Sequence, residues 1–187
     1  MPHSTLPRQS ALLVIDAQQS FTRMPYWRDE ELPRFLSALQ RLDAGCRAAG
    51  VPVVHVLHVD DDPPFQPGSG LVRLLDGVPG HPAACFEKHT HNAFTDTGLD
   101  LWLRRQGVEK IIISGIRTEQ CCETTARIGS DLGYAVDFVS QATLTFPMAH
   151  AGTGRCFSAE EIVIRTELVL SGRFARIVDV DACLASL

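Results

Sequence analysis

Short apolar runs alternate along this chain with longer segments in which apolar residues recur three or four positions apart. Continuous apolar or β-branched runs predict buried strands at Ala11–Ile15, Val51–Val59, Ala84–Lys88, Glu109–Ser114, Tyr134–Val139 and Phe174–Val180. Helical spacing predicts helices at Asp29–Ala49, Leu99–Gly107, Glu119–Gly133 and Ser158–Ser171. Between the second and third strands, Asp60–Pro82 is rich in Pro and Gly and is expected to be a long irregular loop.

Strands and helices that alternate in this way predict a parallel sheet with helices on both faces. A chain of 187 residues is long enough for one well-packed domain and too short for two ordinary ones. We therefore expect an α/β fold, a single-domain three-layer α/β/α structure over residues 1–187 with a mostly parallel six-stranded sheet.

Composition and charge argue against several classes of binding partner. The net charge of −5 is spread without a basic stripe, which argues against nucleic acid as a partner. No apolar stretch approaches the roughly 18 residues that cross a bilayer, and the first ten residues are polar, so we expect no membrane contact and a cytoplasmic location. The six cysteines are scattered without a Cys-x-x-Cys pair, so reduced thiols are expected rather than disulfides or a zinc site.

Three reactive side chains follow the predicted strands. Asp16 ends the first strand, Lys88 ends the third, and Cys121 follows the fourth at the start of a helix, for which Thr118 is a suitable N-cap. Ligands of such sheets bind beyond the carboxyl ends of the strands, so these side chains are expected to meet at one edge. Taken singly, Asp16 could cap a turn, Lys88 could be a solvated strand end, and Cys121 could be a core residue.

Together the three side chains indicate nucleophilic catalysis. A lysine cation and a helix N-terminus both favour a thiolate, so we expect them to lower the pKa of Cys121. Asp16 could accept the thiol proton and return it to a leaving group.

At these residues the chain resembles the isochorismatase-like cysteine hydrolases. The resemblance covers almost the whole chain and is carried by three blocks in the same order: Leu13–Gln18 with Phe21; Lys88 with Asn92–Phe94; and Gly115–Cys121 with Thr125. Glu161–Ile162, Arg165–Thr166 and Arg173–Ala175 also resemble the C-terminal end of the family.

The resemblance implies Asp16 as proton shuttle, Lys88 as supporting cation and Cys121 as nucleophile. It implies a cis peptide bond between Ile116 and Arg117, and an oxyanion hole made by the main-chain N–H groups of Arg117 and Cys121. Phe21 is expected to line the substrate pocket, and Asn92 stands near the place where the family often has Ser, which could alter hydrogen bonding there. No organic cofactor is implied, and the substrate is a small molecule.

The second strand ends in His58-Val59-Asp60-Asp61, which lacks the Asp-x-His pattern that holds a metal in nicotinamidases. His58 and Asp60 are an alternative cation site, but we expect a metal-free amidase, and nicotinamide becomes a less favoured substrate.

Three competing interpretations stay open. Cys121 to Arg127 has the Cys-x5-Arg spacing of cysteine phosphatases, although the intervening segment lacks glycine and contains Glu123. Isochorismate-type hydrolysis of a vinyl ether needs no thiol, so Cys121 favours acyl chemistry instead. A non-catalytic binding protein on this fold is the third.

Self-association is also expected. The loop Asp60–Pro82 carries Phe65, Leu71, Val72, Leu74 and Leu75, of which Leu71, Leu74 and Leu75 have helical spacing, and these residues could dock on the sheet edge or on a second copy. The resemblance favours a homo-oligomer, so we expect a dimer or tetramer.

Overall fold

The computed structural model describes residues 9–187, and residues 1–8 of the expected domain lie outside the described residues. Its centre is a six-stranded sheet with the strand order β3-β2-β1-β4-β5-β8, and every neighbouring pair is parallel. The strands are β1 (Ser10–Ile15), β2 (Val53–His58), β3 (Ala84–Lys88), β4 (Lys110–Ile116), β5 (Ala135–Leu144) and β8 (Arg176–Ile177). The expected three-layer α/β/α fold is confirmed.

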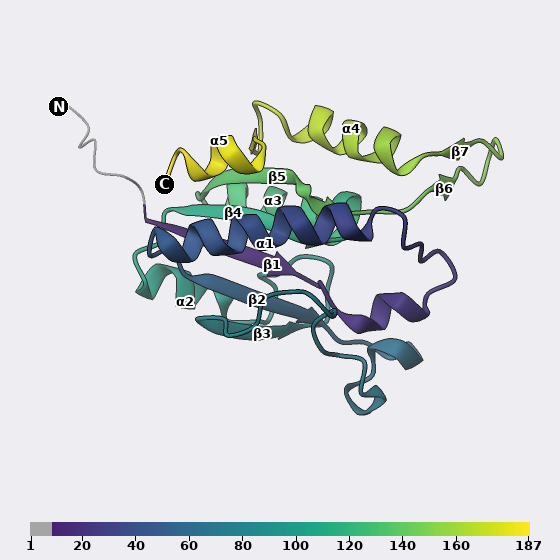
Figure 1. Cartoon of the computed structure of the whole chain (residues 1–187), viewed down its shortest axis with the longest axis horizontal. Coiled ribbons are helices and arrows are strands. Elements are labelled where there is room, and N and C mark those ends of the chain that lie inside the picture. Colours follow the sequence, from purple (N-terminus) through teal and green to yellow (C-terminus); the bar gives the residue numbers. More distant parts are fainter. Residues whose placement is uncertain (1–8) are drawn as a thin grey trace.

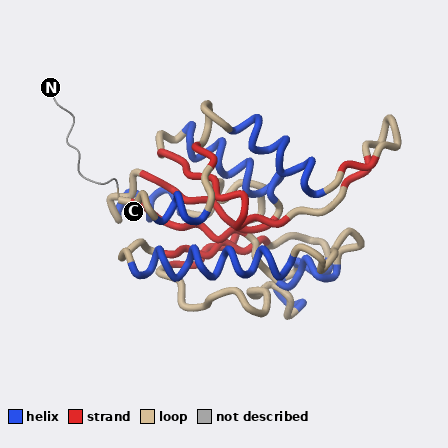
Figure 2. The backbone as a smooth tube through the Cα atoms, turned by 45° about the horizontal axis from the view of Figure 1, so that its top comes forward, coloured by secondary structure: helices blue, strands red, loops and turns tan. Residues whose placement is uncertain are grey.

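Helices cover both faces of the sheet (Figures 1 and 2). On one face, α1 (Leu32–Ala48) and α5 (Val180–Leu184) bury an apolar layer that includes Phe35, Leu39 and Leu42. On the other face, α2 (Leu99–Arg105) and α3 (Glu123–Asp131) pack on the alternate side chains of the same strands, and α4 (Ala159–Leu170) lies beside α3. The central strand β1 is buried along its whole length, because side chains on both its faces enter a core.

The ends of several elements differ from the sequence prediction. The fifth strand continues to Leu144, five residues beyond its predicted end, and the sixth is only two residues long. Helix α4 begins with a capping box: Ser158 Oγ accepts from the Glu161 N–H, and the Glu161 carboxylate accepts from the Ser158 N–H. Two features were not predicted: helix α5, and a projecting hairpin of β6 (Met148–Ala149) and β7 (Cys156–Phe157), seen on the right of Figure 1.

The long loop between β2 and β3 is partly ordered by short 3-10 helices, η2 (Pro63–Phe65) and η3 (Pro67–Ser69). The expected amphipathic helical turn at Leu71, Leu74 and Leu75 is wrong, since Leu74 instead forms a bridge with Gln18. Phe65 and Leu75 are each only 4% exposed and pack in the core of the same molecule. Phe65, Leu74 and Leu75 therefore have intramolecular partners.

Candidate active site

The carboxyl edge of the sheet brings Asp16, Lys88 and Cys121 together, as expected. Asp16 and Lys88 are fully buried, and their carboxylate Oδ2 and ammonium Nζ atoms lie 2.8 Å apart. The Lys88 Nζ also lies 3.5 Å from the Cys121 Sγ. Cys121 is 6% exposed, so the thiol sits at the edge of the buried pair.

The backbone holds each of these groups in place. Asp16 follows β1 in the left-handed region, with φ of 51°, a conformation that aspartate tolerates better than most residues. Its N–H donates to Val56 O of the neighbouring strand, which fixes where the carboxylate leaves the sheet. Lys88 is the last residue of β3, so its long side chain reaches along the sheet edge.

Cys121 lies in a π-helical turn, Thr118–Cys122 (η4), that leads into α3. The expected N-cap at Thr118 is wrong: the turn begins after Arg117 without a side-chain cap, and the Thr118 hydroxyl donates to Thr143 Oγ1 in the core. The wider turn replaces the regular first turn that the sequence pattern predicted. The Ile116–Arg117 peptide bond is cis, as the resemblance implied.

Burial, rather than Lys88, has the largest effect on the pKa of the Cys121 thiol. Removal from water raises the pKa of Cys121 far above its ordinary value, the Asp16 carboxylate raises it further, and Lys88 only partly offsets both effects. The expectation of a lowered pKa is therefore wrong for the resting site. Cys121 rests as a neutral thiol, because a thiolate beside Asp16 would place two anions in a site nearly closed to water.

The opposite charges of Asp16 and Lys88 stabilise each other in the buried site. Burial raises the pKa of Asp16 above its ordinary value, although the Lys88 ammonium acts to lower it. Burial acts to lower the pKa of Lys88, but Asp16 and Cys121 outweigh it and the net shift is upward. We take the pair as ionised, since at 2.8 Å each charge has its counter-ion and a buried charge without one would be far more costly.

Further groups lie at this edge, and the sequence analysis named one of them, His58, only as a candidate cation ligand and not as a neighbour of Lys88. Lys88 Nζ donates to the Thr90 carbonyl at 2.9 Å and lies 3.1 Å from His58 Nδ1. The buried Gln18 amide accepts from the His58 N–H and donates to the His58 carbonyl, which ties the end of β2 to the chain after β1. His58 ends the second strand, so the same sheet-edge rule that found Lys88 could have included it.

The two expected substrate contacts occupy different surroundings. Phe21, in the 3-10 helix η1 (Gln19–Arg23), is 5% exposed and packs edge-to-face on Phe65 with ring centroids 5.1 Å apart. Asn92 Oδ1 accepts from the N–H groups of Phe94 and Thr95, so its side chain orders its own loop. Neither contacts the Asp16–Lys88 pair in a hydrogen bond, and their roles toward substrate stay predictions.

The side chain of Arg127 is already engaged. It makes an ion pair with Glu123 at 3.0 Å, and its guanidinium lies 4.5 Å from the centre of the Phe174 ring. An arginine held by a carboxylate in this way is not free to bind a phosphate, which removes the support for the Cys-x5-Arg phosphatase.

His58 does not fit a metal site of the nicotinamidase type. Its Nε2 lies 2.9 Å from Asp60 Oδ2 and its Nδ1 faces Lys88, so both ring nitrogens have protein partners. Among residues 9–187, no group of three or more His, Cys, Asp or Glu side chains is arranged to hold a metal ion. Within the same residues, no helix is both long and apolar enough to span a bilayer.

Comparison with known proteins places this site in context. Residues 10–167 match the family model of the isochorismatase domain. Nicotinamidase 3 of Arabidopsis thaliana is 31% identical over 95% of this chain and 88% of its own length. Streptothricin hydrolase of Streptomyces noursei is 32% identical over 75% of this chain and 51% of its own length. A crystal structure from Chromobacterium violaceum, assigned to the isochorismatase family of hydrolases, covers 100% of this chain and 98% of its own, with 29% identity and a TM-score of 0.87.

Proposed function

This chain belongs to the isochorismatase family, and on that premise we propose that it hydrolyses a small amide, ureide or related C–N bond through a thioester on Cys121. Hydrolysis of C–N bonds is the coarse activity that the family relatives support. The observation that carries the finer proposal is the contact of Asp16, Lys88 and Cys121 at one sheet edge.

The first half-reaction begins from the neutral thiol. Asp16 takes the proton from Cys121 as Sγ attacks the substrate carbonyl, so that no free thiolate has to persist in the buried site. Lys88 stays protonated and stabilises the sulfur as its negative charge develops. The main-chain N–H groups of Arg117 and Cys121 are proposed to hold the oxyanion, as the family resemblance implies. Asp16 then gives its proton to the leaving nitrogen, and an amine or ammonia departs.

The second half-reaction regenerates the enzyme. Asp16 accepts a proton from water as the water attacks the thioester, and it returns that proton to the sulfur as the acid departs. One water is consumed, and the amide is converted into an acid and an amine. Phe21 and Asn92 are proposed to contact the substrate. We also propose a cytoplasmic location for this activity.

A substrate panel with ammonia detection tests the proposal. Carboxamides (nicotinamide included, because Nicotinamidase 3 is a relative), carbamoyl compounds and ureides should include at least one substrate. Rapid quench and intact mass spectrometry should then show an acyl adduct that maps to Cys121. Turnover without any adduct in single-turnover experiments, or turnover by a Cys121→Ala variant, would contradict the thioester route.

The vinyl-ether alternative makes a different prediction for the same variant. Hydrolysis of a vinyl ether requires protonation rather than a nucleophile, so Cys121→Ala would keep that activity. The direct contact of Cys121 with Lys88 favours the acyl route.

A further inference from the structure

The ammonium of Lys88 has more neighbours than it has protons. Its Nζ lies 2.8 Å from Asp16 Oδ2, 2.9 Å from Thr90 O, 3.1 Å from His58 Nδ1 and 3.5 Å from Cys121 Sγ. An ammonium has three N–H donors, so four acceptors compete for them. Asp16 and Thr90 are the nearest, and His58 and Cys121 are left to share the third.

The protonation of the His58 ring follows from its partners. Nε2 lies 2.9 Å from the Asp60 carboxylate, which can only accept a hydrogen bond, so Nε2 carries the proton. Nδ1 then keeps its lone pair and accepts from Lys88. The ring is also fixed sterically: its side chain is 14% exposed, and the Phe65 ring packs edge-on against it with centroids 5.5 Å apart.

We propose that His58, oriented by Asp60, is a positioning residue that holds the Lys88 ammonium between Asp16 and Cys121. The inference deepens the proposed function and rests on it. In the resting site the thiol is a weak acceptor, so the third Lys88 N–H goes to His58. As the thiol proton moves to Asp16, the sulfur becomes a strong acceptor, and that N–H turns from His58 Nδ1 to Sγ. No proton leaves Lys88 or His58 in this exchange.

His58 therefore has to be neutral for the site to work. The charged and titratable groups that act on it are Lys88 from β3, Asp16 after β1 and Asp60 after β2. Burial and the Lys88 charge lower the pKa of His58 below its ordinary value, although Asp16 and Asp60 act to raise it. Below that pKa, Nδ1 gains a proton and can no longer accept from Lys88, so activity should fall as the pH drops through it.

Nuclear magnetic resonance of protein labelled with nitrogen-15 in its histidines tests the contact without any substrate. At neutral pH, His58 should show a protonated Nε2 and an unprotonated Nδ1, and Asp60→Asn should reduce the share of this tautomer. A His58 ring with its proton on Nδ1, or a charged ring at pH 7, would overturn the inference even if the protein is an amidase.

Activity tests the positioning role. His58→Ala should lower kcat by about tenfold or more with KM little changed, because a misplaced Lys88 affects the reaction and not substrate binding. His58→Asn, whose amide oxygen can take the place of Nδ1, should recover most of kcat and shift the acidic limb of the pH profile to lower pH. Exposed His91→Gln is the control and should match wild type.

The outcomes separate this inference from the proposed function. If the wild-type protein hydrolyses no compound in the panel, the proposed function fails. The His58 tautomer measured by nuclear magnetic resonance then still decides whether Lys88 donates to His58. If wild type is active but folded His58→Ala and His58→Asn keep its kcat and its acidic limb, the positioning role is wrong. Circular dichroism checks that each variant is folded. If His58→Ala does not fold, His58→Asn alone is used for the comparison with wild type.

Discussion

At the scale of single residues, burial determines the protonation state of Cys121 before substrate binds. A lysine 3.5 Å from a thiol suggests an activated thiolate, yet Cys121 is nearly closed to water and also faces the Asp16 carboxylate. In the proposed mechanism, the thiolate nucleophile is therefore formed during the reaction, by proton transfer from Cys121 to Asp16.

Replacement of Cys121 and Cys122, one at a time, should show which of the two is the nucleophile and which only packs in the core. Cys121→Ala should abolish turnover at a cost of about 1–2 kcal/mol in stability. Cys122 is fully buried in the core cluster around α3, so Cys122→Ala should lose comparable stability but keep most activity. Steady-state kinetics and urea unfolding measure both effects. An active Cys121→Ala with an inactive Cys122→Ala would move the nucleophile by one residue.

Alkylation should report the protonation state of Cys121. Because burial and Asp16 raise its pKa, the reactive thiolate is scarce at pH 7, and iodoacetamide should label Cys121 more slowly than exposed Cys156. The rate at Cys121 should keep rising as the pH increases toward that raised pKa. Peptide mass spectrometry gives the rates at each site.

Alkylation of an Asp16→Asn variant tests the effect of the carboxylate on Cys121. Asp16→Asn removes the carboxylate and leaves Lys88 without its counter-ion, so the pKa of Cys121 should fall and its alkylation should accelerate while turnover is lost. Faster labelling of Cys121 than of Cys156 in wild type would mean that Lys88 dominates the resting thiol instead.

Chelation tests the partners of His58. Both of its ring nitrogens are used by Asp60 and Lys88, so EDTA should leave the turnover of the best panel substrate unchanged. The assay is ammonia release before and after dialysis against chelator. Activity that is lost in EDTA and restored by a divalent cation would contradict this.

At the scale of elements, the end of β4 is the tightest junction of the site. Gly115 has φ of 122°, and a Cβ there would lie 1.9 Å from the Ile15 carbonyl oxygen of β1. This close approach joins the strand that leads to Asp16 with the strand that leads to Arg117 and Cys121. A side chain at position 115 would push the two parts of the site apart.

Gly115→Ala should therefore damage both stability and activity. We expect a loss of about 3 kcal/mol or more, because the clash is with backbone and the φ is unfavourable for alanine. Gly68→Ala is the control: a Cβ there meets no atom within 4 Å, so its stability should stay within about 0.5 kcal/mol of wild type. Urea unfolding and kcat/KM give the comparison, and wild-type values for Gly115→Ala would show that this approach is dispensable.

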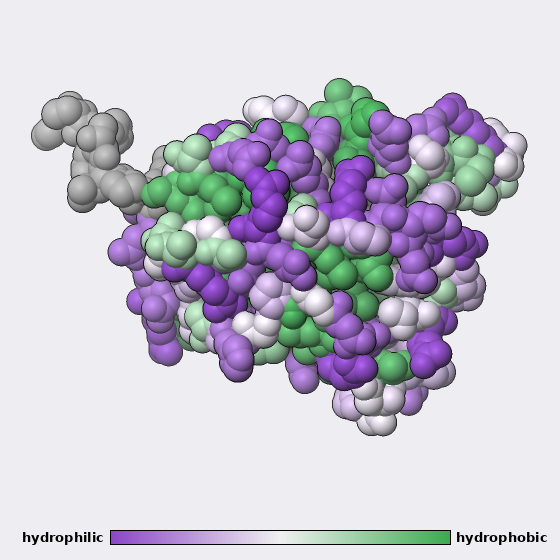
Figure 3. All heavy atoms as spheres, in the orientation of Figure 1, coloured by the Kyte–Doolittle hydropathy of each residue, from purple (hydrophilic) through white to green (hydrophobic). Residues whose placement is uncertain are grey.

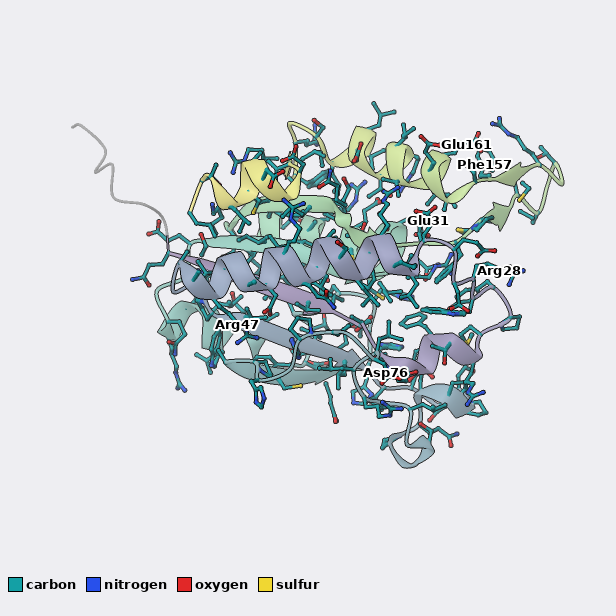
Figure 4. All side chains as sticks on the ribbon, viewed as in Figure 1. Arg28, Glu31, Arg47, Asp76, Phe157 and Glu161 are labelled. Atoms are coloured by element: carbon teal, nitrogen blue, oxygen red, sulfur yellow. The ribbon has the colours of Figure 1, made fainter. Side chains whose placement is uncertain are left out.

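At the scale of the whole molecule, an apolar surface on α4 lacks a partner among residues 9–187. Ile164 and Leu168 of α4 are 56% and 76% exposed. A groove between α4 and the β6–β7 hairpin adjoins them and is lined by Met148, Ala149, Phe157 and Ile162 among others. Figure 3 shows an apolar patch over α4, and Figure 4 shows Phe157 and Glu161 where the hairpin meets this helix.

Self-association through this surface is the expected outcome. The loop Asp60–Pro82 packs on its own chain, so α4 and the hairpin replace it as the expected contact. Light scattering at micromolar concentration should give a dimer or tetramer of the 20.5 kDa chain. Leu168→Glu should shift it toward monomer, while Leu101→Glu, also exposed but on α2, should not. A wild-type mass of one chain would contradict the prediction.

The sequence by itself determined the sheet and the edge at which the site forms. Continuous apolar runs can be buried on both faces only inside a covered parallel sheet, and the residues that end those runs must then meet at one edge. Asp16, Lys88 and Cys121 were found in this way. The family resemblance added the cis bond between Ile116 and Arg117.

Only the tertiary structure decided how these groups behave. The protonation of Cys121 depends on how much water the packing excludes, which no local pattern contains. The contact of His58 with Lys88 depends on the register of β2 beside β3, which pairs these two residues directly. The loop after β2 and the hairpin after β5 were likewise undetermined, because turns and short strands take their conformation from the surfaces that they meet.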